Sequence, residues 1–185
     1  MNGHFIALCL VGVFVTSTLV PVETSAQTQT DPSARTAQED SIRETVLRYQ
    51  MEGWANDGDK NEREAKDQQE RNIARQLNSR VYFLSVNGKD PSEEFLKRFQ
   101  DFPRTIKKAS QSMQTKKFSG WVVDKKTKQP GIVFRADEIR WIKEGEVEVG
   151  GGYHCGGLCA AGDVFTVHLE NGRWKVVAVR MEWIS

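Results

Sequence analysis

The sequence lacks a strong excess of charge, and it lacks the short motifs that mark common catalytic and nucleotide-binding sites. Its 26 lysines and arginines nearly balance 25 acidic residues, so the formal net charge is only +1. A charge this small does not imply a nucleic-acid partner. There is no glycine-rich phosphate loop, nucleophile elbow or zinc-protease motif to indicate a reaction. No internal repeat is present, and the length fits one domain.

A long apolar run occurs only near the N-terminus. Residues 5–15 are nearly all apolar, and small and polar residues follow, ending in Thr24-Ser25-Ala26. This pattern is typical of a secretory signal peptide. The run is shorter than the ~20 residues that span a bilayer, so an uncleaved anchor is the less favoured alternative. We predict a signal peptide over 1–26, cleavage after Ala26, a periplasmic or secreted mature protein, and no stable membrane span after cleavage.

The remaining sequence predicts a disordered leader over 27–39 and a single α+β domain over 40–185. Ser41 and Glu44 form a capping-box pattern, which predicts a helix that ends near Gly53 and the polar cluster 56–59. A second, exposed helix is expected within 60–78 and a strand over 81–86. Ser92 is expected to cap a short helix. Further strands are expected over 119–123, 132–136, 139–143, 146–154, 163–170 and 173–184.

Helices followed by a run of antiparallel strands predict a domain in which the helices pack on one side of a curved sheet. The clearest local signal is Asn171-Gly172 between two alternating segments, which is typical of a type I′ hairpin turn. The register that follows pairs Glu170 with Arg173, Leu169 with Trp174, Val167 with Val176, Phe165 with Ala178 and Asp163 with Arg180.

This register places an Asp and an Arg at the open end of an apolar surface, an arrangement found in small-molecule pockets. Asp163 is our candidate general base if burial raises its pKa, and Arg180 is the candidate partner for an anionic or carbonyl oxygen. Tyr153, Phe165 and Trp174 are the candidate ligand-binding residues. The alternative is an ordinary cross-strand ion pair between Asp163 and Arg180.

Two cysteines, Cys155 and Cys159, lie in a glycine-rich segment over 150–162. In an oxidising compartment a disulfide between them is favoured. Two free thiols, or a metal site that adds His154, are the alternatives. The metal site is the weakest because zinc usually takes more protein ligands than this segment offers. We therefore predict no metal and no cofactor.

Residues 104–128 carry eight basic residues against one acidic residue, Asp124. Such a stretch can bind nucleic acid or anionic lipid. It is also typical of solvated loops and sheet edges, where lysines discourage edge-to-edge pairing. We favour the second interpretation and expect no nucleic-acid partner.

The element order resembles the nuclear transport factor 2-like superfamily. Segments such as Asp90-Pro91-Ser92, Ile139-Arg140-Trp141, Gly156-Gly157-Leu158 and Asn171-Gly172-Arg173-Trp174 are also similar to an uncharacterised group of exported bacterial proteins. The resemblance covers roughly residues 40–185. It implies a cone-like, cystatin-like architecture with a pocket, in a superfamily that includes both enzymes and non-catalytic binding modules.

Three functions remain open. The first is non-catalytic binding of a small apolar ligand. The second is an isomerase, cyclase or dehydratase type of acid–base reaction that uses Asp163. The third is a homodimeric interaction module that pairs through an exposed apolar sheet face.

Overall fold

The computed structural model describes residues 32–115 and 120–185. The predicted signal peptide and the first part of the predicted leader lie outside these residues. Within the described ranges, no helix has both the length and the apolar character needed to cross a membrane.

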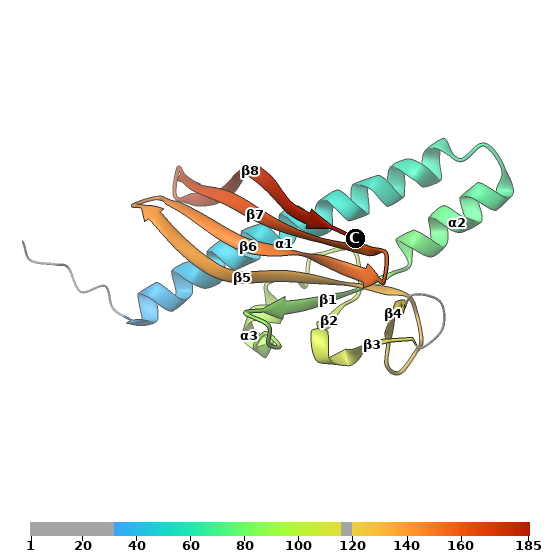
Figure 1. Ribbon diagram of the computed structural model, residues 1–185, viewed down its shortest axis with the longest axis horizontal. Helices are drawn as coiled ribbons and strands as arrows, with labels where there is room; N and C mark the ends of the chain where they lie inside the picture. Colours follow the sequence, from blue (N-terminus) through green and yellow to red (C-terminus); the bar gives the residue numbers. More distant parts are fainter. Residues whose placement is uncertain (1–31, 116–119) are drawn as a thin grey trace, which may run out of the picture. The chain divides into compact units, whose positions relative to one another are not determined.

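The described chain has an α+β fold, in which a long helix packs on a curved, mostly antiparallel sheet (Figure 1). The helical elements are α1 (Pro32–Glu64), α2 (Gln68–Asn78), α3 (Glu93–Lys97) and the short 3-10 helix η1 (Ala109–Gln111). The strands are β1 (Val81–Val86), β2 (Ile106–Lys108), β3 (Ser112–Gln114), β4 (Val122–Asp124), β5 (Gly131–Lys143), β6 (Glu146–Gly156), β7 (Cys159–Glu170) and β8 (Arg173–Ile184).

The main sheet has the order β2-β1-β5-β6-β7-β8, and β3 and β4 form a separate pair. The predicted strand over 81–86 is confirmed as β1, and Ser92 caps α3 by accepting a hydrogen bond from the Phe95 N–H. We expected an antiparallel sheet, and this is wrong for one strand. β1 pairs in parallel with both β2 and β5. The connection through α3 returns the chain to the end where β1 began, which makes a parallel pairing possible.

Helix α1 is longer than the sequence indicated at both ends. It begins at Pro32 rather than Ser41, so residues 32–39 are helical and are not a disordered leader. Pro32 suits a first helical position, and the Ser41 hydroxyl donates to the Ala37 carbonyl instead of capping the helix. The Arg35 guanidinium lies 4.3 Å from the centre of the Trp141 ring, which holds the first turns against the sheet.

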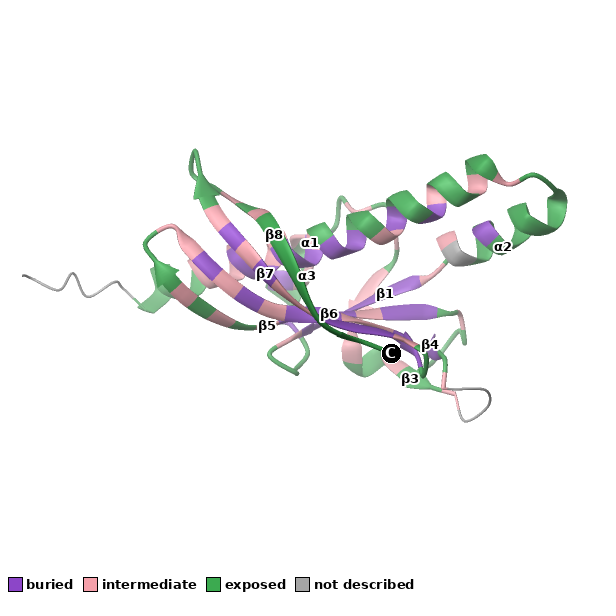
Figure 2. Cartoon of the chain, turned by 45° about the horizontal axis from the view of Figure 1, so that its top comes forward, coloured by how far each residue is buried: buried purple, intermediate pink, exposed green. Residues whose placement is uncertain are grey.

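Packing on the sheet explains why α1 continues past Gly53 and the polar cluster 56–59. Ile42, Val46, Leu47 and Met51 form a fully buried stripe on the helix. Figure 2 shows this buried side of α1 and the buried central strands, whereas β8 is exposed along most of its length. Burying this stripe outweighs the weak helix propensity of the glycines that follow it.

Glycines allow the sheet to bend where β6 pairs with β7. Gly152 has a φ of +133°, which side-chain-bearing residues rarely adopt. Gly162 pairs with Trp183, and a Cβ at Gly162 would collide with the Trp183 indole. The glycine-rich segment singled out in the sequence is thus explained in part by sheet curvature.

The basic stretch over 104–128 is largely engaged in local ion pairs and hydrogen bonds. Arg104 lies 2.9 Å from Asp59, and Lys108 lies 2.6 Å from Glu93. Lys107 lies 2.7 Å from Asp124, whose side chain is almost fully buried. Asp124 also accepts hydrogen bonds from the backbone N–H groups of Lys126 and Thr127. The described basic residues of this stretch therefore mainly stabilise the local fold. Lys116 and Lys117 lie outside the described residues.

We expect Asp124→Asn to lower the free energy of unfolding at neutral pH. The Lys107 ammonium and the backbone N–H groups hold the pKa of Asp124 well below its ordinary value of 3.8. The stabilisation is therefore fully present above about pH 4 and is lost as the pH falls below it. Urea unfolding should show a difference between wild type and variant at pH 7 that narrows in acid. Glu144→Gln, at an exposed acid, is the control, and a difference that does not change with pH would contradict the assignment.

Candidate functional site

The β7–β8 hairpin has the predicted register only near its turn. Glu170 faces Arg173, Leu169 faces Trp174 and Val167 faces Val176, as expected. A β-bulge at Val177 then shifts the pairing, so that Phe165 faces Val179 rather than Ala178. Asp163 faces Met181, and the predicted pair with Arg180 does not form. A bulge inserts one extra residue, and this exchanges the faces of the residues that follow it.

The bulge turns Arg180 away from the candidate site and brings Val179 into it. Arg180 is directly opposite Val164 and so lies on the sheet face away from α1, where its guanidinium is 3.5 Å from Glu182. Val179 shares the face of Phe165, which is buried beneath α1. The proposed catalytic pair is therefore reduced to Asp163.

A groove with a volume of about 270 Å³ lies between α1 and strands β6 to β8. It is open on one side, where Tyr49 and Val179 are both exposed. The residues that line it are Tyr49, Gln50, Gly53, Trp54 and Asp57 from α1, and Tyr153, Asp163, Phe165 and Val179 from the sheet. The structure thus brings together three of the predicted site residues, Tyr153, Asp163 and Phe165.

Aromatic rings form most of the groove wall. Trp54 packs edge-to-face on Tyr153 with ring centres 4.9 Å apart, and Tyr49 packs edge-to-face on Phe165 at 6.1 Å. Between these two pairs, α1 presents Gly53, and a Cβ there would meet no atom within 4 Å. Gly53 is exposed, so the groove opens to solvent at this position.

Trp174 lies elsewhere in the fold. Its ring packs on Trp141 with ring centres 5.9 Å apart, near the N-terminal turns of α1. It does not line the groove. The prediction that Trp174 contributes to the same site as Asp163 relied on the face that the two residues share, but they lie at opposite ends of the strand pair.

Asp163 is a partly buried carboxyl without a positive partner. Burial raises its pKa above the ordinary value, and the nearby Glu182 carboxylate raises it further. In the described part of the chain, Asp163 forms no ion pair and accepts no hydrogen bond from a side chain. Ionisation of Asp163 is therefore less favourable in the folded protein than in the unfolded chain.

The contribution of α1 to the groove was not predicted from the sequence. Gln50, Gly53 and Asp57 lie near or beyond the point where the helix was expected to end, so no helical face was assigned to them. The signal that was available is the spacing of Gln50, Gly53, Trp54 and Asp57, which places all four on one face of a continuous helix.

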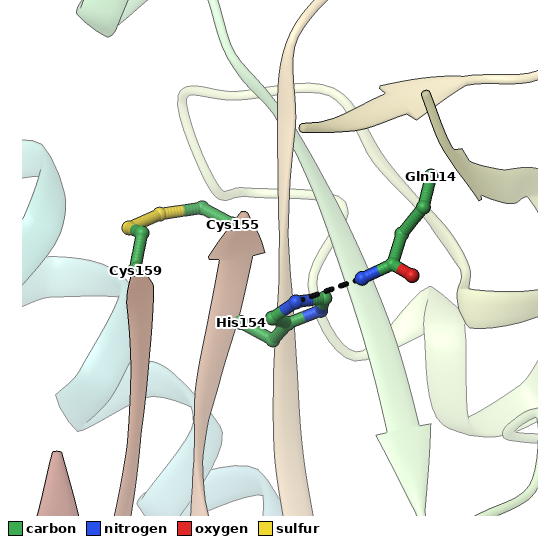
Figure 3. The surroundings of a disulfide bond; sticks show 4 residues. All are labelled: Gln114, His154, Cys155 and Cys159. Carbon is green, nitrogen blue, oxygen red and sulfur yellow. Dashed lines mark hydrogen bonds between the residues drawn. A yellow bond between two sulfur atoms is a disulfide. The ribbon is translucent and has the colours of Figure 1, made fainter. Parts of the chain in front are cut away.

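The predicted disulfide between Cys155 and Cys159 is confirmed (Figure 3). Cys155 is buried in the core, and the bridge lies on the sheet face that α1 covers. His154 points to the opposite face, where its Nε2 lies 2.9 Å from the amide nitrogen of Gln114 on β3. Among the described residues, no cluster of His, Cys, Asp and Glu is arranged to hold a metal ion.

Comparisons with known proteins found no match among family models, curated proteins or solved structures.

We expect carbon-detected NMR titration to place the pKa of Asp163 above 3.8 and to show a lower value in Glu182→Gln. The substitution removes the negative charge that helps to raise the pKa, while burial still raises it. Glu170→Gln, near the hairpin turn, is the control and should leave the pKa of Asp163 unchanged. An Asp163 pKa at or below its ordinary value in the wild type would show that the groove does not shield this carboxyl from water.

Proposed function

We propose that this protein binds a small, largely apolar ligand in the groove between α1 and the sheet. The observation that carries the proposal is the unfilled space at Gly53, walled by two pairs of aromatic rings. Apolar walls with a few polar groups are typical of small-molecule sites. At about 270 Å³, the groove fits a ligand of roughly one ring and a short chain.

We propose that this binding is non-catalytic. Asp163 is the one acid–base group from the prediction that lines the groove, and its expected partner, Arg180, lies on the other face. The groove-lining residues include no Ser, Cys or His side chain that would act as a nucleophile, and the second carboxyl, Asp57, is exposed to solvent.

Gly53→Leu should abolish binding of an apolar probe without loss of stability. The leucine side chain fills the open space, and replacing a helical glycine adds about 0.5–1 kcal/mol of helix stability. The measurement is the fluorescence of the neutral dye N-phenylnaphthylamine titrated with the protein. We expect the apparent affinity to fall at least about tenfold.

Gly150→Leu is the matched control for this experiment. A Cβ at Gly150 would also meet no atom within 4 Å, but Gly150 pairs with Val164 on the face away from α1. This variant should bind the dye as the wild type does. Equal loss in both variants, or equal binding in Gly53→Leu and wild type, would overturn the proposed site.

The raised pKa of Asp163 favours acid–base chemistry as a second candidate function. A carboxyl whose pKa is raised above its ordinary value is a stronger base than an ordinary Asp. Asp163 would then act alone as the general base of an isomerase, cyclase or dehydratase. Conversion of a bound compound that stops in Asp163→Asn while binding persists would favour this function over simple binding.

We also propose that the chain is exported and has the cone-like arrangement of the nuclear transport factor 2-like superfamily. The observations that support this are the disulfide, which suits an oxidising compartment, and the helix on a curved sheet with a groove between them.

A homodimer through β8 remains the alternative to a ligand-binding monomer. β8 is an edge strand with Val177, Met181 and Trp183 exposed.

Mass spectrometry of the full-length chain expressed in a host bacterium tests export and the dimer together. We expect protein recovered from the periplasm to begin at Gln27 and to be two hydrogens lighter than the reduced chain, because the disulfide removes two thiol hydrogens. Native spectra should show a monomer. An intact chain in the membrane fraction would contradict export, and a dimer that survives dilution would favour the interaction module.

A further inference from the structure

The acceptors that line the groove include the carboxyl groups of Asp57 and Asp163 and the amide of Gln50, beside the hydroxyl and indole donors of Tyr49, Tyr153 and Trp54. Gln50 is 8% exposed, and its amide nitrogen donates to the Arg135 carbonyl at 2.9 Å. A carbonyl only accepts hydrogen bonds, so this contact fixes the orientation of the amide. The Gln50 Oε1 atom is then buried without a hydrogen-bond partner among the described residues. A buried acceptor without a partner is unusual, and its partial negative charge belongs to a residue that lines the groove.

The charged groups that line the groove are both carboxylates, Asp57 and Asp163. Among the described residues, neither carboxylate forms an ion pair, and no basic side chain lines the groove. Arg180 lies on the other sheet face beside Glu182, and the Arg80 guanidinium lies over the Trp54 ring, 5.7 Å from its centre, without lining the groove. The groove is therefore negative, and its charge is complementary to a molecule that brings a positive charge.

The aromatic walls favour the same kind of ligand. Ring faces attract cations, and an ammonium group held between aromatic rings and a carboxylate gains from both. An anionic ligand would meet two carboxylates and an unpaired carbonyl oxygen, and it would find no basic side chain among the groove-lining residues.

We propose that the ligand of this groove is a small amphipathic amine, whose ammonium group contacts Asp163 and whose apolar body lies against the aromatic walls. This inference rests on the proposed function, because it identifies the class of ligand for the same groove. It also departs from the sequence-based expectation, in which Arg180 would have selected an anionic or carbonyl group.

The test compares three probes of nearly equal size that differ in head group: phenylpropylamine, phenylpropanol and phenylpropanoate. Isothermal titration calorimetry at neutral pH and low salt gives the affinity of each for the mature protein. We expect the amine to bind at least about tenfold more tightly than the alcohol, and the carboxylate to bind most weakly. In Asp163→Asn, the preference for the amine over the alcohol should fall about tenfold, whereas Glu144→Gln should keep it.

The outcomes separate the two proposals. If the three probes bind equally, or if the carboxylate binds best, the amine inference is wrong, while binding that Gly53→Leu removes still supports the groove. If none of them binds and the neutral dye does not bind either, the groove is not a ligand site and both proposals fail. Should Asp163→Asn not fold, the ranking of the three probes on the wild type decides the inference by itself.

Discussion

The packing of one apolar stripe of α1 on the concave face of the sheet is the interaction on which the rest of this structure depends. Ile42, Val46, Leu47 and Met51 are fully buried against the central strands, where Phe134, Val147 and Val149 are equally buried. Because this burial supplies most of the stability of the helix, α1 tolerates glycines and polar residues that would end an isolated helix. The same packing holds the next helical face, with Gln50, Gly53 and Trp54, above the sheet.

The groove arises where this packing becomes incomplete. Towards the β8 edge the helix presents a glycine, and the β-bulge at Val177 turns the strand so that Val179 and Met181 face the helix side. The Asp163 carboxyl beneath the opening, whose pKa is raised by burial and by Glu182, adds a cost to stability above its ordinary pKa. The Asp163 carboxyl therefore lowers the stability of the free protein, and a ligand of suitable charge would supply the positive partner.

Local signals predicted the parts of the fold that depend on neighbouring residues. Asn171-Gly172 predicted the hairpin turn and its first pairs correctly, because positive φ at both turn residues restricts the turn type. The Ser92 cap was also predicted from local sequence, and the disulfide was favoured because the chain was expected to be exported to an oxidising compartment. The β-bulge at Val177 carries no comparable signal, so the pairing of Asp163 with Arg180 was extended along a register that the strand does not keep.

The sequence by itself determined the α+β class, the hairpin turn, and the presence of Asp163 and Phe165 on one face of the sheet, and it favoured the bridged cysteines over two alternatives. Tertiary structure alone decided where α1 begins and ends, which face Arg180 occupies, and which helical residues complete the groove. The reason is physical: turns and caps are stabilised by atoms close in sequence, whereas helix length and strand register are decided by burial against distant elements. The negative, aromatic groove is a product of that second kind of interaction.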